Sequence, residues 1–532
     1  MSVTYSRRAI LGGLLSSAAG AALAEGPLTS LRPNARSGVA TASAVNAPLE
    51  TSPIPRIAPR VRATLEQIIA SADLDGTVGV VLTDASTGEV IEQIDGDVSL
   101  PPASVTKAVT ALYALDVLGG AFRFVTRLIA TGPIEDGILH GDLILAGGGD
   151  PTLSADHLAE LAEALKAAGV SEITGKFLCW RGALPYAEEI EPSQLDHLGY
   201  NPAVSGLNLN FNRVHFEWKR VNGSWQTTMD ARTENRVPRV YMANVRIVDR
   251  GAPVFATDGP DSWTVARSAL GNGGSRWMPV RQPALYAGDV FQTLAREAGV
   301  PLPAPEVVDD LPGGVEVAQH RSATLRVILR DMLLYSTNLT AEICGLAATQ
   351  ARFRTSLAIE SSAAQMTRWL GETYGIEGRF VDHSGLSDVN RVSAADMVKV
   401  MQAVGADGPL RPILRRIPMR DAENDRIENF PNEVRAKTGT LNFVSSLAGY
   451  VETADGSDVV FAIIAANLER REQGKAAGDE VPAGSIEWNR RAKRLQQVLL
   501  QHWSLTHDDD RPFSQGVDID AQLDASEANS GN

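Results

Sequence analysis

Apolar and polar side chains along the chain alternate in some segments and recur at helical spacing in others. Residues 77–82 form a short apolar run and residues 89–93 alternate apolar with polar side chains. Turn-forming residues separate the two segments, which predicts a β-hairpin. Residues 105–118 place apolar side chains at intervals of three and four, and Gly119 follows them. This pattern predicts a buried helix that has Ser104 at its first turn.

The second half of the chain repeats both patterns. Helices are predicted at 323–334, 341–349, 361–374 and 485–502, and strands at 433–437, 446–452 and 459–467. We expect the early hairpin and the late strands to form one antiparallel sheet with helices packed on it.

The stretch 124–312 has a different character. Short strand-like runs at 141–145, 237–241 and 271–274 are split by glycine, proline and asparagine. Such mixed α and β signals predict one or two inserted domains. The expected fold class is therefore α+β, with a first domain (61–123 and 313–505) divided by a large mixed α/β insert.

The two ends of the chain differ in composition from its interior. Residues 1–24 contain Arg7, Arg8, an apolar run and a small-x-small sequence before Glu25, which predicts an export signal similar to the twin-arginine type. Residues 25–60 are rich in Pro, Ala, Ser and Thr, and residues 506–532 are acidic. A flexible linker and a disordered acidic tail are the expected structures. We therefore expect a periplasmic protein.

Composition excludes several kinds of partner. The chain has 532 residues and 49 lysines and arginines against 64 aspartates and glutamates, a net charge of −15 that opposes binding to nucleic acid. No later stretch approaches about 20 uninterrupted apolar residues, so no transmembrane segment is expected in the mature protein. The only cysteines, Cys179 and Cys344, are expected to be buried free thiols. The histidines lack close ligand spacing, so we expect neither a metal nor a cofactor.

Two motifs place a serine at the start or the end of a predicted helix. Ser104 and Lys107 stand three residues apart, so both side chains project from the same helical face. A lysine of lowered pKa can take the proton of a serine and make it a nucleophile. Ser336 and Asn338 follow a second predicted helix, although a capping turn also favours these residue types.

A third motif, Lys437-Thr438-Gly439-Thr440, lies at the end of a predicted strand. The lysine and threonines offer a cation and hydroxyl groups to an anion, and the glycine leaves room for a ligand against the strand. A lysine on an edge strand also serves as a guard against aggregation. Proximity of Lys437 is our expected cause of a lowered Lys107 pKa.

Together the three motifs resemble the signature of the penicillin-binding and active-site-serine β-lactamase superfamily. The long separation of Ser104 from Ser336 and the segments 148–153 and 382–387 (Asp-His-Ser-Gly-Leu-Ser) narrow the match. They resemble the D-alanyl-D-alanine carboxypeptidase/endopeptidase family, the class C low-molecular-mass penicillin-binding proteins. The resemblance implies a penicillin-binding, β-lactamase-like transpeptidase domain with a helical lobe.

The resemblance also implies an activity and residue roles. The enzyme would hydrolyse peptidoglycan stem peptides or cross-links through an acyl-enzyme, and β-lactam antibiotics would inhibit it. Its implied catalytic residues are the nucleophile Ser104, the base Lys107, the proton relay Ser336 and the amide Asn338. Its implied substrate-binding residues are Lys437, Thr438, Gly439, Thr440 and Asn442.

One departure and two alternatives accompany this interpretation. Asp388 stands where relatives often carry a basic residue, so a preference for the acidic diaminopimelate end of the peptide does not follow. A β-lactamase or esterase of the same superfamily would need a base for rapid deacylation, and none is evident. A non-catalytic peptidoglycan-binding protein would have no need of Lys107.

Overall fold

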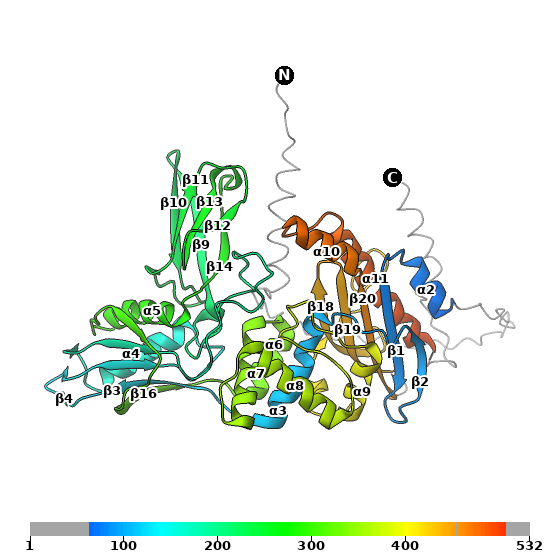
Figure 1. Cartoon of the computed structure of the whole chain (residues 1–532), viewed down its shortest axis with the longest axis horizontal. Coiled ribbons are helices and arrows are strands. Elements are labelled where there is room, and N and C mark those ends of the chain that lie inside the picture. Colours follow the sequence, from blue (N-terminus) through cyan, green and yellow to red (C-terminus); the bar gives the residue numbers. More distant parts are fainter. Residues whose placement is uncertain (1–62, 454–455, 507–532) are drawn as a thin grey trace, which may run out of the picture.

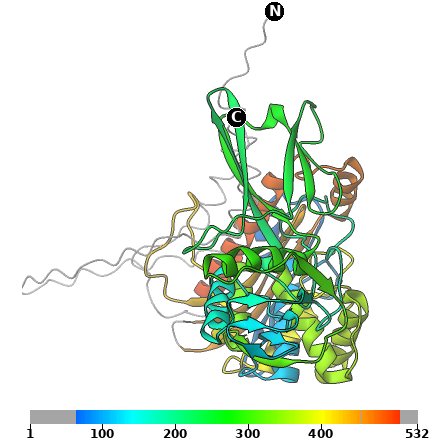
Figure 2. The same ribbon diagram turned by 90° about the vertical axis from the view of Figure 1, so that its left-hand side faces the viewer.

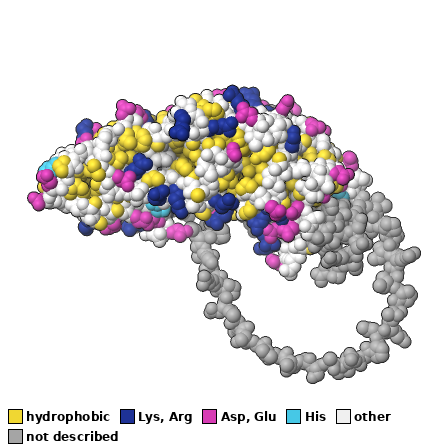
Figure 3. All heavy atoms as spheres, turned by 90° about the horizontal axis from the view of Figure 1, so that it is seen from below, with side chains coloured by type: hydrophobic (Ala, Val, Ile, Leu, Met, Phe, Trp, Pro, Cys, Tyr) yellow, Lys and Arg dark blue, Asp and Glu magenta, His cyan; other side chains and the backbone are white. Residues whose placement is uncertain are grey.

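A computed structural model describes residues 63–453 and 456–506 of the chain. The predicted export signal, the linker and all but the first residue of the acidic tail lie outside the described residues. Figure 1 shows two parts side by side: a sheet covered by helices, and an elongated part built from the middle of the sequence. On the face seen in Figure 3, basic and acidic side chains are interspersed, so the net negative charge does not gather into one patch there.

A six-stranded sheet forms the centre of the first part. Its strands, in spatial order, are β17 (Arg415–Arg416), β18 (Glu433–Leu441), β19 (Val444–Glu452), β20 (Asp458–Ala466), β1 (Thr77–Asp84) and β2 (Val90–Ile94). All neighbours are antiparallel, and β1 pairs with β20 along its whole length, from Thr77 opposite Ala466 to Asp84 opposite Val459. The early hairpin and the late strands therefore share one sheet, and the predicted α+β class is confirmed.

Helices cover both faces of this sheet. They are α2 (Leu65–Ser71), α3 (Thr106–Leu118), α6 (Leu325–Tyr335), α7 (Asn338–Phe353), α8 (Ile359–Tyr374), α9 (Ala394–Val404), α10 (Leu468–Ala477) and α11 (Ser485–Thr506), with 3-10 turns η1 (Ala103–Val105) and η4 (Arg411–Ile413). Alternate residues of β20 enter different cores: Ala462 and Ile464 pack with α3 and α7 to α9, and Phe461 packs with α2 and α11. Burial on both faces explains why β20 reads as one continuous apolar run.

The helix α3 lies at the centre of the helical layer. Its residues from Thr106 to Ala114 are all buried, and Tyr113 packs against Trp369 of α8 with ring centroids 5.2 Å apart. The helix ends at Gly119, whose φ of 78° is open to glycine at no steric cost. A helix buried on every side is a fixed platform for the residues at its start.

The middle of the chain builds four smaller sheets. Its elements are β3 (Val125–Ala130), β4 (Ile134–Glu135), β5 (Ile138–Leu139), β6 (Leu143–Ala146), α4 (Ala155–Ala167), β7 (Glu172–Ile173), β8 (Phe177–Trp180), η2 (Asn210–Asn212), β9 (Arg213–Val221), β10 (Ser224–Asp230), β11 (Asn244–Val248), β12 (Phe255–Thr257), β13 (Ser262–Ala266), η3 (Arg267–Ala269), β14 (Gly273–Pro279), α5 (Pro283–Glu297), β15 (Pro305–Val308) and β16 (Val315–Arg321). The five-stranded sheet has the order β15-β8-β6-β3-β16. Figure 2 shows the β9 to β14 region standing above it.

Two details of the middle region differ from the sequence prediction. Residues 237–241 form no strand, because Pro238 has no N–H to donate and only Arg239 makes an isolated bridge, to Asp230. The helices α4 and α5 were not predicted. Because β16 pairs with β3, we define the insert as β3 to β16.

Two further findings concern thiols and membrane spans. Cys179 and Cys344 are both free and buried, as predicted. Within the part of the chain that the structure describes, no helix has the length and apolar composition needed to cross a membrane.

Candidate active site

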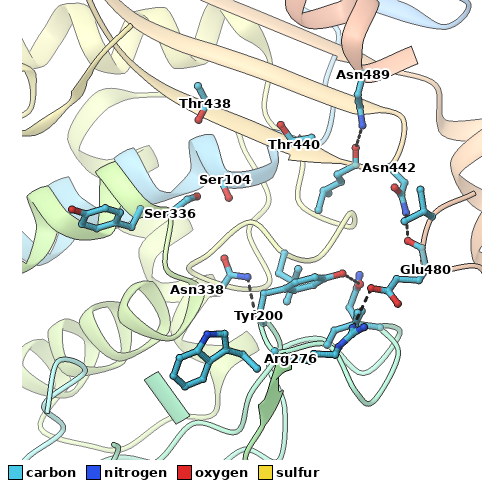
Figure 4. A pocket seen from close by; sticks show the side chains of 18 of the residues that line it. Ser104, Tyr200, Arg276, Ser336, Asn338, Thr438, Thr440, Asn442, Glu480 and Asn489 are labelled. Carbon is cyan, nitrogen blue, oxygen red and sulfur yellow. Dashed lines mark hydrogen bonds and ion pairs between the residues drawn. The ribbon is translucent and has the colours of Figure 1, made fainter. Parts of the chain in front are cut away.

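The three predicted motifs meet at one groove. Ser104 belongs to η1, which packs against β18 and β19, and Lys107 lies in the first turn of α3. Figure 4 shows the groove between β18, the start of α7 and a loop of the insert. The cavity has a volume of about 2780 Å³, and the predicted residues that line it are Ser104, Ser336, Asn338, Thr438, Gly439, Thr440 and Asn442. Lys107 and Lys437 are both buried and do not line the cavity. Their hydrogen-bond partners Ser104, Asn338 and Ser336 do line it.

Lys107 is the centre of a hydrogen-bond network. Its Nζ donates to Ser104 Oγ at 2.9 Å, to Asn338 Oδ1 at 2.7 Å and to the Ser384 carbonyl at 2.6 Å. Burial lowers the pKa of Lys107 to about 7, against the raising effects of Asp382 and Glu342. The predicted cause was wrong: burial, not proximity of Lys437, lowers this pKa. At neutral pH a large fraction of the amine is therefore unprotonated and able to accept a proton.

Two buried carboxyl groups lie behind Lys107. Asp382 accepts hydrogen bonds from the N–H groups of Gly385 and Ser387, both at 2.7 Å, and so holds the loop whose carbonyl binds Lys107. Glu342 accepts from the N–H of His383. Burial raises the pKa of Glu342 to about 8, and the charge of Asp382 adds to the shift.

Neither carboxyl group was singled out from the sequence as part of the site. Glu342 lies four residues after Asn338, one helical turn along the same face of α7, and that spacing is a signal visible in the sequence. Asp382 lies in a segment already noted for its resemblance, but its hydrogen bonds depend on the folded loop.

Replacing Glu342 by glutamine is expected to change how stability depends on pH. The folded-state pKa of Glu342 lies above the ordinary 4.5, so the native protein retains a proton that the unfolded chain releases. The stability contributed by the neutral carboxyl is complete below about pH 4.5 and is lost as the pH rises towards 8. We therefore expect the unfolding free energy of Glu342→Gln, relative to wild type, to increase between pH 5 and about pH 8.

Denaturant titrations at several pH values measure this difference. Glu360→Gln, at an exposed position of α8, is the matched control and should show a constant difference. A constant difference for Glu342→Gln as well would contradict the assignment of a neutral buried carboxyl.

Ser336 and Lys437 form a second contact across the groove. Ser336 ends α6 with a φ of 59°, in the left-handed region, and α7 begins two residues later. Lys437 Nζ donates to Ser336 Oγ at 3.0 Å and to the Thr438 carbonyl at 2.8 Å. Burial, followed by the charge of Lys107, lowers the Lys437 pKa well below its usual value.

Asn338 connects the groove to the insert. Its Oδ1 accepts from Lys107, and its Nδ2 donates to the Tyr200 carbonyl at 2.9 Å. Figure 4 shows Tyr200 opposite Ser104 in the groove. Since both polar atoms of the side-chain amide are engaged, the orientation of Asn338 is fixed, and a loop of the insert forms one wall of the site.

Gly439 allows η1 to lie directly against β18. A Cβ atom at this position would lie 2.2 Å from Ser446 Oγ and 2.6 Å from the Pro102 carbonyl oxygen. Ser446 Oγ itself donates to that carbonyl at 2.5 Å. The glycine thus sets the separation between the strand and the turn that carries Ser104.

The far end of the groove is held by ion pairs. Asp388 is buried and pairs with Arg471 at 2.6 Å and Lys475 at 3.1 Å, and both cations line the groove. Asn442 lies in the same region: its carbonyl accepts from Arg471 and its Nδ2 donates to the Glu480 carbonyl.

Glu480 also joins this end of the groove to the insert. Its carboxylate lies 3.1 Å from His197 Nε2 and 3.2 Å from the Arg276 guanidinium. Figure 4 shows the ion pair with Arg276. Sequence reasoning did not identify this bridge, because its members lie far apart along the chain.

Other titratable clusters do not add a site. In residues 63–453 and 456–506, no three His, Cys, Asp or Glu side chains are grouped as metal ligands. His383 is buried against Ser362, with Oγ and Nε2 2.8 Å apart, and burial lowers its pKa to about 3. It is neutral and is held within the core.

Comparison with known proteins identifies related sequences and folds. The model of the D-Ala-D-Ala carboxypeptidase 3 (S13) family matches residues 61–483. The chain is 27% identical over 458 residues to a D-alanyl-D-alanine carboxypeptidase of Actinomadura sp. (strain R39), covering 76% of this chain and 80% of the relative. It is 29% identical over 421 residues to a carboxypeptidase of Mycobacterium tuberculosis, covering 76% and 79%. The crystal structure of penicillin binding protein 4 from Haemophilus influenzae shares the fold, with a TM-score of 0.67 at 20% identity, over 83% of this chain and 100% of that one.

Proposed function

The chain belongs to the D-Ala-D-Ala carboxypeptidase 3 (S13) family of serine peptidases, and on that premise we propose that it cleaves peptidoglycan peptides through an acyl-enzyme on Ser104. The observation that carries the proposal is the 2.9 Å hydrogen bond between Ser104 Oγ and the buried amine of Lys107. A nucleophile and a base of lowered pKa, in contact on a rigid helix, are what acylation of a serine requires.

The reaction begins when Ser104 Oγ attacks the carbonyl carbon of the penultimate D-Ala. Neutral Lys107 takes the hydroxyl proton, and the backbone N–H groups of Ser104 and Thr440 stabilise the oxyanion. Ser336 relays the proton held by Lys107 to the leaving amine as the C–N bond breaks, which returns Lys107 to its neutral form and leaves an ester on Ser104 and free D-Ala. Water then attacks the ester, Lys107 accepts a proton from the water and gives it to Ser104 Oγ as the ester bond breaks, and the shortened peptide leaves.

Substrate binding is assigned to the groove around β18. Asn338 holds the peptide amide while it keeps Lys107 in place. Lys437 positions Ser336 by donating a hydrogen bond to its hydroxyl group. The Thr438 and Thr440 hydroxyl groups contact the terminal carboxylate of the substrate or of penicillin. Gly439 leaves room for the extended peptide, and Asn442 lines the subsite farther along. The size of the groove supports a cross-linked peptide as a second substrate, that is, endopeptidase activity.

Intact mass spectrometry with benzylpenicillin tests the proposal. We expect one stable adduct per chain, mapped by proteolysis to the peptide that contains Ser104 and not to the one that contains Ser336, together with D-Ala release from a D-Ala-D-Ala peptide. Rapid turnover of a chromogenic cephalosporin without an adduct would favour the β-lactamase alternative. No reaction with any of these compounds would favour a non-catalytic peptidoglycan-binding protein.

Export to the periplasm is the second part of the proposal. It is supported by the sequence of residues 1–24, with Arg7 and Arg8 in the pattern of a twin-arginine signal. N-terminal sequencing of the exported protein should give Glu25 as the first residue. A chain that retains Met1 in the cytoplasm would contradict export.

A Gly439→Ala variant is expected to acylate about 100-fold more slowly, because the added methyl group pushes η1 and Ser104 away from β18. The measurement is the rate of adduct formation with benzylpenicillin. Gly371→Ala in α8 is the matched control, because its Cβ would meet only one atom, at an ordinary 3.5 Å. Equal rates for the two variants would show that close contact at Gly439 is not needed.

A further inference from the structure

The ammonium group of Lys437 is buried and does not line the groove. The residue is only 1% exposed, and its Nζ is engaged by Ser336 Oγ and the Thr438 carbonyl. A carboxylate bound at β18 would therefore meet the Thr438 and Thr440 hydroxyl groups, but no exposed cation from this motif.

Arg415 places a cation at that position. In β17 it pairs with Ala436 of β18, and paired residues direct their side chains to the same face of a sheet. Thr438, two residues beyond Ala436, shares this face and is the diagonal neighbour of Arg415, a separation that a long side chain can span. Arg415 lines the same cavity as Ser104 and Thr438.

The neighbourhood of β17 brings Arg415 close to both sides of the groove. Besides β18, β17 packs against α6, the helix that ends at Ser336. The positive charge of Arg415 acts on the buried Lys437, whose pKa it helps to lower after burial and the charge of Lys107. Arg415 therefore lies where the second and third motifs meet.

The guanidinium group of Arg415 has no ion pair or side-chain hydrogen bond with any residue that the structure describes, and the residue is exposed. Its neighbour Arg416 pairs with Glu433, and Arg411 pairs with Glu452 and Asp458. An unpaired guanidinium beside a buried lysine is electrostatically unfavourable, and an anion in the groove would relieve the repulsion.

We propose that Arg415 binds the carboxylate of the residue that follows the scissile amide bond, which is the terminal carboxylate in a peptide without a cross-link. The inference rests on the proposed function, because it assigns a binding residue to the same groove. The planar guanidinium forms a charge-assisted, two-point contact with the carboxylate, while Thr438 and Thr440 complete its coordination. Lys437 then acts as a positioning residue for Ser336.

Benzylpenicillin and its methyl ester test this assignment, since they differ only in the carboxylate. Acylation rates are measured by intact mass for wild type, Arg415→Ala, Arg415→Lys and the matched control Arg416→Ala. We expect the ratio of the benzylpenicillin rate to the ester rate to fall about 10- to 100-fold in Arg415→Ala and to recover in part in Arg415→Lys. The ratio for Arg416→Ala should equal that of wild type.

Three outcomes would overturn the assignment. An unchanged ratio in Arg415→Ala would show that the carboxylate is bound without this residue. The same fall in Arg416→Ala would indicate a general effect of surface charge. A wild type that neither compound acylates would instead overturn the proposed function, and the role of Arg415 with it.

Discussion

A Ser104→Ala variant is expected to form no penicillin adduct and to release D-Ala at least about 10⁴-fold more slowly than wild type. In wild type the Ser104 hydroxyl group is hydrogen-bonded to the buried amine of Lys107. Alanine lacks this hydroxyl group, so the acyl group has no oxygen atom to which it can bond. Intact mass measures the adduct, and quantification of free D-Ala measures turnover.

The Ser104→Ala experiment needs a control for a general serine effect. Ser224→Ala, at an exposed position of β10 in the insert, should acylate as wild type does. Wild type, Ser104→Ala and Ser224→Ala should have similar thermal unfolding temperatures, because alanine fits the space that Ser104 occupies. An adduct that persists in Ser104→Ala would show that another residue is the nucleophile.

A Lys107→Arg variant is expected to acylate about 10³- to 10⁴-fold more slowly. In wild type, burial lowers the Lys107 pKa to about 7, so the neutral form increases as the pH rises through 7 and the acylation rate should rise with it. An ordinary lysine, with a pKa of 10.5, would be only about 0.03% neutral at pH 7. Arginine stays protonated throughout this range and cannot accept the proton of Ser104.

The pH profile separates loss of the base from loss of the fold. Wild type should show a limb centred near pH 7, whereas the residual rate of Lys107→Arg should show no such limb. Lys176→Arg, an exposed position that keeps its ion pair with Glu306, is the matched control. Acylation of Lys107→Arg at the wild-type rate would exclude Lys107 as the base.

The sequence indicates the site best where spacing along one element determines proximity. Ser104 in η1 and Lys107 at the start of α3 are neighbours because residues three apart in consecutive helical turns share a face, and the apolar pattern of 105–118 correctly predicts α3. The predicted end of α6 before Ser336 is likewise correct, because the apolar pattern stops there.

The remaining contacts depend on the tertiary fold. Tyr200 reaches Asn338 through its backbone carbonyl, a group that every residue carries, so no residue type marks it. Arg415 is one of many arginines, and only the pairing of β17 with β18 places it diagonally across from Thr438. Burial, which lowers the Lys107 pKa, arises from packing of segments far apart in the sequence.

The pairing of β1 with β20 also determines the order in which the enzyme can assemble. β1 is the first strand of the central sheet along the sequence, and on one side it pairs with β20, the last strand. The sheet therefore cannot form completely before residues 458–466 have been synthesised. Contacts between segments so distant in sequence form late, because a long loop must be closed first. A nascent chain that already carries Ser104 and Lys107 still lacks β18 and the groove. Ser104, the proposed nucleophile, therefore remains without the wall of the groove that β18 forms until these late strands have been synthesised.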